Sequence, residues 1–217
     1  MKDKAEIVCI LDRSGSMASI IDDAIGGYNT FLLEQKKIPK PADLMVVQFD
    51  EEYKVVYQGL LNDAPAMNKD TYVPRGCTAL LDALGRTLNS VGERLSITPE
   101  ADRPDKVIFL IVTDGMENAS QEFTHEQIKK MVNHQEEKYG WEFIYVGSNQ
   151  DAIAVAGNIG IRSFNAVNYA SSKKGARASY QIMSSAVGST RSRGTSIADS
   201  MGKGLDVDEE GNIIKRS

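Results

Sequence analysis

Short apolar runs alternate along this chain with longer segments in which apolar residues recur at helical spacing. The first run, residues 7–11, is continuously apolar, which is typical of a strand covered on both faces in the middle of a parallel sheet. Two runs separated by Asp50-Glu51-Glu52 predict a hairpin, and therefore one antiparallel edge strand. In all, the pattern predicts strands at residues 7–11, 44–49, 53–57, 106–113, 141–146 and, as a last edge strand, 161–164.

Helical periodicity is clearest where apolar residues repeat at intervals of three and four, at Leu81, Leu84, Leu88, Val91 and Leu95. Further helices are predicted over about residues 21–37, 124–137 and 151–158. Ser171 or Ser172 can cap a final helix, whose apolar face would be made of Ala176, Tyr180, Met183 and Val187. Strands that alternate with helices predict an α/β fold with a doubly wound, mostly parallel central sheet and one antiparallel edge strand.

These elements predict one main domain with a C-terminal extension. We expect residues 1–170 to form the α/β domain and residues 171–190 to form a helix packed on it. From Gly188 onward the periodicity ends, and Gly, Ser, Thr and Arg dominate before an acidic cluster. Residues 191–217 are therefore predicted to be a disordered tail.

The composition is that of an ordinary globular protein, with 41% apolar and 25% charged residues. A formal net charge of −5 makes the chain a poor general binder of nucleic acid. No apolar run reaches the roughly 18 residues of a membrane span, and the N-terminus lacks a signal-peptide core. Cys9 and Cys77 are expected to stay reduced. We therefore expect a cytoplasmic protein without a membrane partner.

Polar side chains follow the first strand directly. Asp12, Ser14 and Ser16 alternate in sequence, so a short extended loop can point their three oxygen-bearing side chains the same way. Such a loop lies beyond the carboxyl end of a strand, where open α/β sheets form their sites. Mg²⁺ takes oxygen ligands and needs few carboxylates, because it keeps several waters. On these three residues alone, however, helix caps and turns are the better explanation.

Two distant residues complete a five-residue set: Thr78 at a loop-to-helix junction, and Asp114 after the strand at residues 106–113. With them the chain resembles the von Willebrand factor A family, of the bacterial or phage cytoplasmic type. The metal-ion-dependent adhesion site of that family has the pattern D-x-S-x-S, a later Thr and a later Asp. The resemblance extends over residues 4–165 and implies a site for Mg²⁺, with Mn²⁺ or Ca²⁺ as alternatives, made of Asp12, Ser14, Ser16, Thr78 and Asp114.

Three further residues lie close to this set in the sequence. Asp82 lies four residues after Thr78 on the same helical face, where it can hydrogen-bond a metal ligand or stay solvated. Glu117 can fill an open metal position or orient a bound water. Asn118 is better explained as a turn residue at the rim of the site.

The resemblance implies a binding module rather than an enzyme. Ser14, Ser16 and Thr78 would coordinate the metal directly, while Asp12 and Asp114 would hold metal-bound waters or coordinate in alternate states. An Asp or Glu of a partner protein would complete the shell. Because many bacterial members of the family work with an ATPase or a stress-response system, a regulatory or scaffolding subunit is a second hypothesis.

A metal-assisted hydrolase is a third hypothesis, with Glu117 as the nearby candidate for a general base. The sequence lacks the G-x-S-x-G, P-loop, H-E-x-x-H and G-x-G-x-x-G motifs, and so lacks the common nucleophile, nucleotide and zinc-protease signatures. Cys77 has no candidate His base nearby, which disfavours a catalytic thiol.

Overall fold

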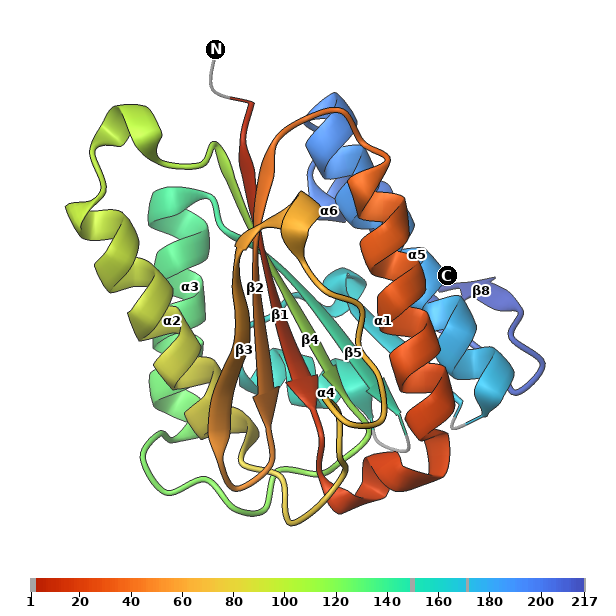
Figure 1. Cartoon of the computed structure of the whole chain (residues 1–217). Helices are drawn as coiled ribbons and strands as arrows, with labels where there is room; N and C mark the ends of the chain where they lie inside the picture. Colours follow the sequence, from red (N-terminus) through yellow and green to blue (C-terminus); the bar gives the residue numbers. More distant parts are fainter. Residues whose placement is uncertain (1–2, 149–150, 171, 217) are drawn as a thin grey trace.

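One twisted sheet runs through the molecule in the computed structural model, which describes residues 3–148, 151–170 and 172–216 (Figure 1). Within those residues, eight strands stand in the order β3-β2-β1-β4-β5-β6-β7-β8. Their bounds are β1 Ala5–Asp12, β2 Ala42–Phe49, β3 Tyr53–Leu60, β4 Lys106–Thr113, β5 Glu142–Ser148, β6 Ala166–Tyr169, β7 Leu205–Val207 and β8 Ile213–Lys215.

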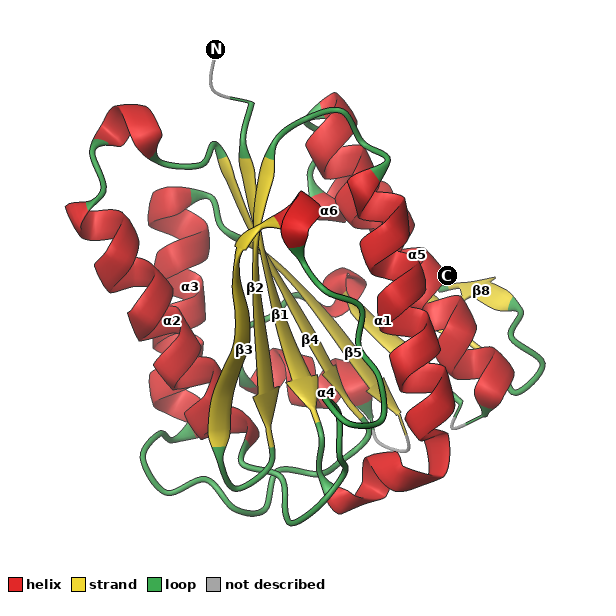
Figure 2. Ribbon diagram, in the orientation of Figure 1, coloured by secondary structure: helices red, strands yellow, loops and turns green. Residues whose placement is uncertain are grey.

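Helices cover both faces of this sheet (Figure 2). One face carries α2 (Leu80–Ile97), α3 (His125–Tyr139) and α4 (Ala152–Asn158), and the other carries α1 (Ile21–Lys36), α5 (Lys173–Arg193) and α6 (Ile197–Met201). Short 3-10 helices lie at Gly15–Ile20, Leu61–Asp63, Glu100–Asp102 and Ser163–Asn165. None of the helices in the described part of the chain combines the length and the apolar character needed to cross a membrane.

The central strand β1 explains the unbroken apolar run. Ile7, Cys9 and Leu11 face the core beneath α1 and α5, while Val8 and Ile10 face the core beneath α2 and α3. β1 pairs in parallel with β2 and β4, and β3 pairs antiparallel with β2 at the edge. The predicted fold class is therefore confirmed: a doubly wound, mostly parallel sheet with the expected antiparallel edge strand.

Local signals set the ends of the helices. Thr124 accepts a hydrogen bond from the backbone N–H of Gln127 in a capping box that starts α3, and Gly140, with a φ of 65°, ends it. Ser172 caps α5 by accepting from the N–H of Gly175, while the alternative cap, Ser171, lies outside the described residues. The predicted apolar face of α5 is buried as expected.

The last predicted strand, residues 161–164, is wrong. Ile161 is buried, but its N–H donates to the carbonyl oxygen of Ala156 at 2.8 Å, so it closes the end of α4 against the core. The strand begins later, at Ala166, and pairs with β5 on one side and β7 on the other. Ile161 is apolar because it packs beneath a helix, not because it belongs to the sheet.

The expected disordered tail, residues 191–217, is also wrong over the residues described up to 216. α5 continues to Arg193, α6 follows, β7 pairs in parallel with β6, and β8 forms a second antiparallel edge. Ile197, Met201 and Val207 are buried in the core beneath α1 and α5. A five-residue helix and three-residue strands are too short to show a hydrophobic period, which is why the pattern did not reveal them.

Candidate metal centre

The two aspartates of the predicted set come together because their strands are neighbours. Asp12 is the last residue of β1, and Asp114 directly follows Thr113, the last residue of β4. The strands pair in parallel, with Leu11 beside Val112, so their carboxyl ends meet at one edge of the sheet. The strand order reverses beside β1, and such a switch point is where open α/β sheets form ligand sites.

Ser14 and Ser16 link the two aspartates. The backbone N–H of Ser14 donates to Oδ1 of Asp12 at 2.6 Å, which folds the loop back on its own aspartate. The hydroxyl oxygens of the two serines lie 3.0 Å apart, and Ser16 donates to Oδ1 of Asp114 at 2.5 Å. Four of the five predicted residues therefore lie in one chain of hydrogen bonds.

Gly115 marks the point at which Thr78 joins the other groups. A Cβ on Gly115 would overlap Oγ1 of Thr78, and would lie 3.0 Å from Oδ2 of Asp12 and 3.1 Å from Oγ of Ser14. A side chain at position 115 would thus fill the space between these oxygens. Gly115 was not predicted as part of the site, and its place directly after Asp114 is the sequence signal that points to it.

Thr78 is held in place by the loop that follows Asp114. Its N–H donates to Oδ1 of Asn118 at 2.9 Å, and its carbonyl oxygen accepts from the N–H of Asn118 at 3.0 Å. The N–H of Gly15 donates to the carbonyl oxygen of Gly76 at 3.1 Å, which ties the serine loop to the Thr78 loop. Asn118 is therefore more than the predicted turn residue, because it fixes the position of a proposed ligand.

Glu117 braces the same loop against α2. Its Oε2 accepts from the N–H of Leu81 at 3.0 Å and from the hydroxyl of Ser120 at 2.8 Å, and its Oε1 accepts from the N–H groups of Ala119 and Ser120. Leu81 lies in the first turn of α2, where backbone N–H groups lack partners inside the helix. Both oxygens of Glu117 are occupied, so the geometry does not favour the predicted contact with a metal or its water.

Asp82 acts on the loop rather than on a ligand side chain. Its carboxylate accepts from the backbone N–H groups of residues 121–123 at 2.8 to 3.0 Å. No hydrogen bond joins it to any of the five predicted ligands within the described residues. Asp82 therefore stabilises the loop that carries Asp114 and Asn118, and does not hydrogen-bond a proposed metal ligand directly.

Two residues that hold Asp12 were not predicted. The hydroxyl of Thr113 donates to Oδ2 of Asp12 at 2.5 Å, and the hydroxyl of Tyr72 donates to the carbonyl oxygen of Asp12. With the N–H of Ser14 on Oδ1, the carboxylate is fixed in one orientation. Thr113 could be suspected as a hydroxyl that ends a buried strand. Tyr72 carries no such signal, because it comes from a loop 60 residues away.

The two carboxylates are buried, and no Lys, Arg or His side chain of the described residues forms an ion pair with them. Asp12 is 0% exposed and Asp114 is 7% exposed. Burial raises the pKa of Asp12, hydrogen bonds from Thr113 and Ser14 lower it in part, and the charge of Asp114 raises it further. Burial also raises the pKa of Asp114, against the hydrogen bond from Ser16. No basic side chain of the described residues pairs with either group, and unpaired buried charge is unfavourable, so the arrangement fits a bound cation.

The donor set limits the kind of cation. In the part of the chain that the structure describes, no group of three or more His, Cys, Asp and Glu side chains could hold a metal. The site instead offers two carboxylates and three hydroxyls. Mg²⁺ accepts few carboxylates and keeps waters, whereas Ca²⁺ takes about six to eight oxygen ligands. The residues present therefore fit Mg²⁺, or the similar Mn²⁺, better than Ca²⁺.

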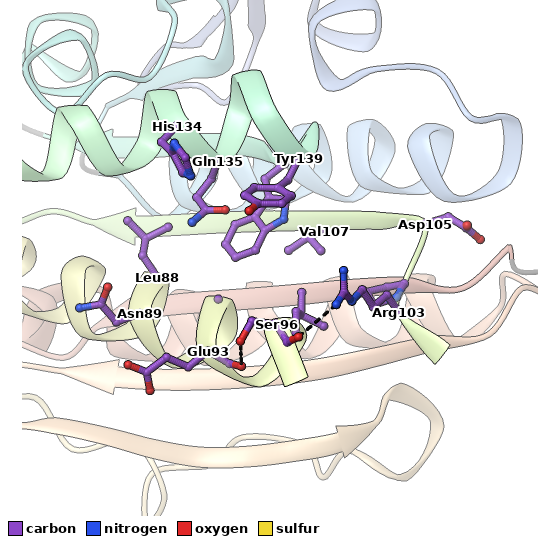
Figure 3. A pocket seen from close by; sticks show the side chains of 14 residues that line it. Leu88, Asn89, Glu93, Ser96, Arg103, Asp105, Val107, His134, Gln135 and Tyr139 are labelled. Carbon is purple, nitrogen blue, oxygen red and sulfur yellow. Dashed lines mark hydrogen bonds between the residues drawn. The ribbon is translucent and has the colours of Figure 1, made fainter. Parts of the chain in front are cut away.

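A separate cavity of about 460 Å³ lies between α2 and α3 (Figure 3). Its walls include Leu88 and Glu93 of α2, His134 and Tyr139 of α3, and Val107 at the start of β4. None of the eight predicted site residues lines it. It lies at the opposite end of β4 from Asp114, so it is independent of the candidate metal centre.

No protein-family model and no curated protein matches the chain, whereas solved structures do. The von Willebrand factor domain of Mfa5, the type V pili tip protein of Porphyromonas gingivalis, has a TM-score of 0.61 at 10% identity, over 90% of this chain and 98% of that one. A von Willebrand factor type A structure from Catenulispora acidiphila has a TM-score of 0.55 at 14% identity, over 95% of this chain and 44% of that one.

The ArnB paralog VWA2 from Sulfolobus acidocaldarius has a TM-score of 0.50 at 15% identity, over 78% of this chain and 41% of that one. This chain thus spans less than half the length of the Catenulispora and Sulfolobus structures. At such low identities the likeness shows the fold alone. The chain has the fold of a von Willebrand factor A domain.

Proposed function

We propose that this protein is a Mg²⁺-dependent binding module that captures an Asp or Glu of a partner protein, through a metal held by Asp12, Ser14, Ser16, Thr78 and Asp114. The observation that carries the proposal is the convergence of two buried carboxylates and three hydroxyls around Gly115, where no basic side chain of the described residues pairs with either carboxylate. The likeness of the fold to a pilus tip protein and to the pilus adhesin SpaC from Lactobacillus rhamnosus GG supports a protein partner in general.

An open position on the metal is the reason why a partner's acid would bind. Bound Mg²⁺ would supply a Lewis-acidic centre with affinity for a further anion. The chain contributes only two carboxylates, and the negative charge of Asp12 is already shared with the donors Ser14 and Thr113. Three neutral hydroxyls add no charge. The formal charges of the ion and the two carboxylates would cancel, but the five side chains would not fill an octahedral shell, and a carboxylate would bind Mg²⁺ at the open position more strongly than a neutral amide does.

Binding is favoured over hydrolysis by the surroundings of Glu117. Both of its oxygens accept hydrogen bonds from backbone N–H groups, so it is not free to act as a general base on a metal-bound water. Cys77, exposed beside Thr78, is no better candidate as a nucleophile, because its hydrogen bond with Glu51 raises the pKa of the thiol. A regulatory or scaffolding role beside an ATPase, in the cytoplasm, stays a prediction from the family resemblance.

Thermal melting in EDTA and in excess MgCl₂ tests the metal. A ligand specific for the native state adds about 2.7 kcal/mol at 100 times its dissociation constant, which corresponds to a shift of several degrees. Ser14→Ala should reduce the difference between the two melts and leave the melt in EDTA nearly unchanged. Equal melting temperatures for the wild type in the two buffers would overturn the proposal.

Affinity capture with the wild type and with an Asp12→Ala, Ser14→Ala double variant tests the partner. A partner held through the metal should be lost in EDTA and with the double variant. Changing its contacting acid to the amide should weaken binding. Retention in EDTA would contradict the proposal, and so would hydrolysis of a phosphoester that disappears in Glu117→Gln.

A further inference from the structure

Two arginines meet one buried aspartate beside the candidate metal centre. Arg13 lies inside the D-x-S-x-S loop, and Arg75 lies three residues before Thr78, so each belongs to a loop that carries proposed ligands. Nε of Arg75 donates to Oδ2 of Asp50 at 2.8 Å, and Nε of Arg13 lies 3.1 Å from the same oxygen as an ion pair. Asp50, at the tip of the β2–β3 hairpin, is 1% exposed. One buried carboxylate thus joins the two ligand-bearing loops.

The backbone repeats this connection. The N–H of Arg75 donates to the carbonyl oxygen of Arg13 at 2.8 Å, which joins the two loops directly. The N–H of Arg13 donates to the carbonyl oxygen of Phe49 at 2.7 Å, and the N–H of Ala79 donates to the carbonyl oxygen of Asp50 at 3.0 Å. Both loops are therefore fastened to the end of β2, on either side of Asp50.

Asp50 is the member of this cluster that water screens least. Glu52 also contacts both arginines, but its side chain is 67% exposed, and exposed ion pairs contribute little. Oδ1 of Asp50 accepts from the N–H of Glu52 at 2.6 Å, while Oδ2 faces the two guanidinium groups. The carboxylate therefore holds its own hairpin turn through Oδ1 and contacts both ligand-bearing loops through Oδ2.

We propose that Asp50 is a positioning residue, which sets the distance between the loop of Asp12, Ser14 and Ser16 and the loop of Thr78, and so sets the affinity of the metal centre. This inference rests on the proposed function. Thr78 reaches the site from a different element than the serines do, and Mg²⁺ demands near-ideal ligand distances. Small relative shifts of the two loops would therefore lower the affinity for the metal.

Asp50→Asn keeps the size of the side chain and removes the charge that holds the arginines. The variant should bind Mn²⁺ about 10- to 100-fold more weakly in a direct titration, and should lose most of the Mg²⁺-induced shift in melting temperature. Glu6→Gln is the matched control, because it breaks another buried carboxylate–arginine pair, with Arg94, at the far end of β1. It should lower the melting temperature in EDTA and leave the Mn²⁺ affinity unchanged. Equal Mn²⁺ affinity of Asp50→Asn and the wild type would overturn the proposal.

Arg75→Gln separates positioning from plain electrostatics. Removing a positive charge near a cation strengthens cation binding if charge alone matters, whereas loss of the contact that holds the two loops together weakens it. We expect Arg75→Gln to bind Mn²⁺ more weakly than the wild type. The double variant Asp50→Asn, Arg75→Gln should bind Mn²⁺ no more weakly than Asp50→Asn alone, because both changes break the same ion pair between Asp50 and Arg75. Tighter binding by Arg75→Gln would overturn the positioning role.

The outcomes also distinguish this inference from the proposed function. A wild type without any response to Mg²⁺ or Mn²⁺ would overturn both. A wild-type response that Asp50→Asn retains would overturn only the role of Asp50. Because the side chain of Arg75 is 49% exposed, Arg75→Gln is expected to fold and keeps the test valid if Asp50→Asn does not fold.

Discussion

Strand β1 carries a buried carboxylate near each end, and the two are accommodated differently. Near the amino end, Glu6 is 2% exposed and pairs with Arg94. At the carboxyl end, Asp12 is 0% exposed and has hydrogen-bond donors, but no basic side chain among the described residues faces it. Buried charges in folded proteins are normally paired. The comparison teaches that the chain supplies a basic partner for the carboxylate near one end of β1 and none at the other end, where the proposed cation would balance the charge.

The largest effect on this comparison is expected from Gly115→Ala. The added methyl group would overlap Oγ1 of Thr78 and crowd Asp12 and Ser14, so the oxygens could no longer surround a cation. We expect the entire Mg²⁺ stabilisation to disappear, about 2.7 kcal/mol at 100 times the dissociation constant. Crowding in a packed site should cost a further 1–3 kcal/mol or so in EDTA. Chemical denaturation with and without MgCl₂ measures both.

Gly26→Ala is the control for that variant. Gly26 lies inside α1, and a Cβ there would meet nothing within 4 Å. Alanine should therefore raise the stability by up to about 1 kcal/mol through helix propensity, equally in EDTA and in Mg²⁺. A Gly115→Ala protein that still responds to Mg²⁺ would show that the oxygens around Gly115 do not hold the metal.

A smaller effect, confined to the amino end of β1, is expected from Glu6→Gln. Burial raises the pKa of Glu6 and Arg94 lowers it in part, so the ion pair offsets some of the cost of burying the charge. An amide removes the charged hydrogen bond from Arg94 but also removes a buried charge whose cost Arg94 offsets only in part, so the loss of stability should be small, about 1 kcal/mol or less. Urea denaturation should show the same loss with and without Mg²⁺. A loss that depends on Mg²⁺ would contradict the independence of the two ends.

The sequence predicted the fold well where local pattern and buried surface agree. The continuous run of β1 and the three- and four-residue repeat of α2 are direct consequences of what each element buries, and both can be read along the chain. The prediction of a disordered tail failed because the buried residues there form no local pattern. Ile197, Met201 and Val207 are buried one at a time by elements of five residues or fewer, and only the partner strand β6 makes them part of a sheet.

The five proposed metal ligands were implied by the resemblance to the von Willebrand factor A family, and the structure brings their side chains together. What holds them could not be predicted in the same way. Glu117 was considered for chemistry but binds the first turn of α2, and Asp50 appeared only as part of a hairpin turn. Such roles depend on which loop lies beside which, and tertiary packing decides that after the pattern of each segment is set.

The smallest effect, and the one whose sign matters most, is expected from Asp114→Asn in EDTA. Burial raises the pKa of Asp114 in the folded protein, so its contribution to stability is present below the unfolded pKa and is lost as the pH rises through the folded pKa. At pH 7 without metal, the ionised group therefore opposes folding. An amide mimics the protonated acid and can still accept the hydrogen bond from Ser16.

We therefore expect Asp114→Asn to be more stable than the wild type in EDTA at pH 7, and less stable than the wild type in excess Mg²⁺. The advantage in EDTA should shrink as the pH falls through the folded pKa of Asp114, because the wild-type group then becomes protonated.

Glu122→Gln is the control of opposite sign. The hydrogen bond from Arg86 lowers the pKa of this exposed carboxyl, so loss of the charged carboxylate should reduce stability slightly and leave the Mg²⁺ response intact. Melting curves of the three proteins from pH 5 to pH 8, in both buffers, would show the reversal. If Asp114→Asn were less stable than the wild type in EDTA as well, groups of the chain itself would stabilise the buried charge at the carboxyl end of β1. The contrast with Glu6 would then fail.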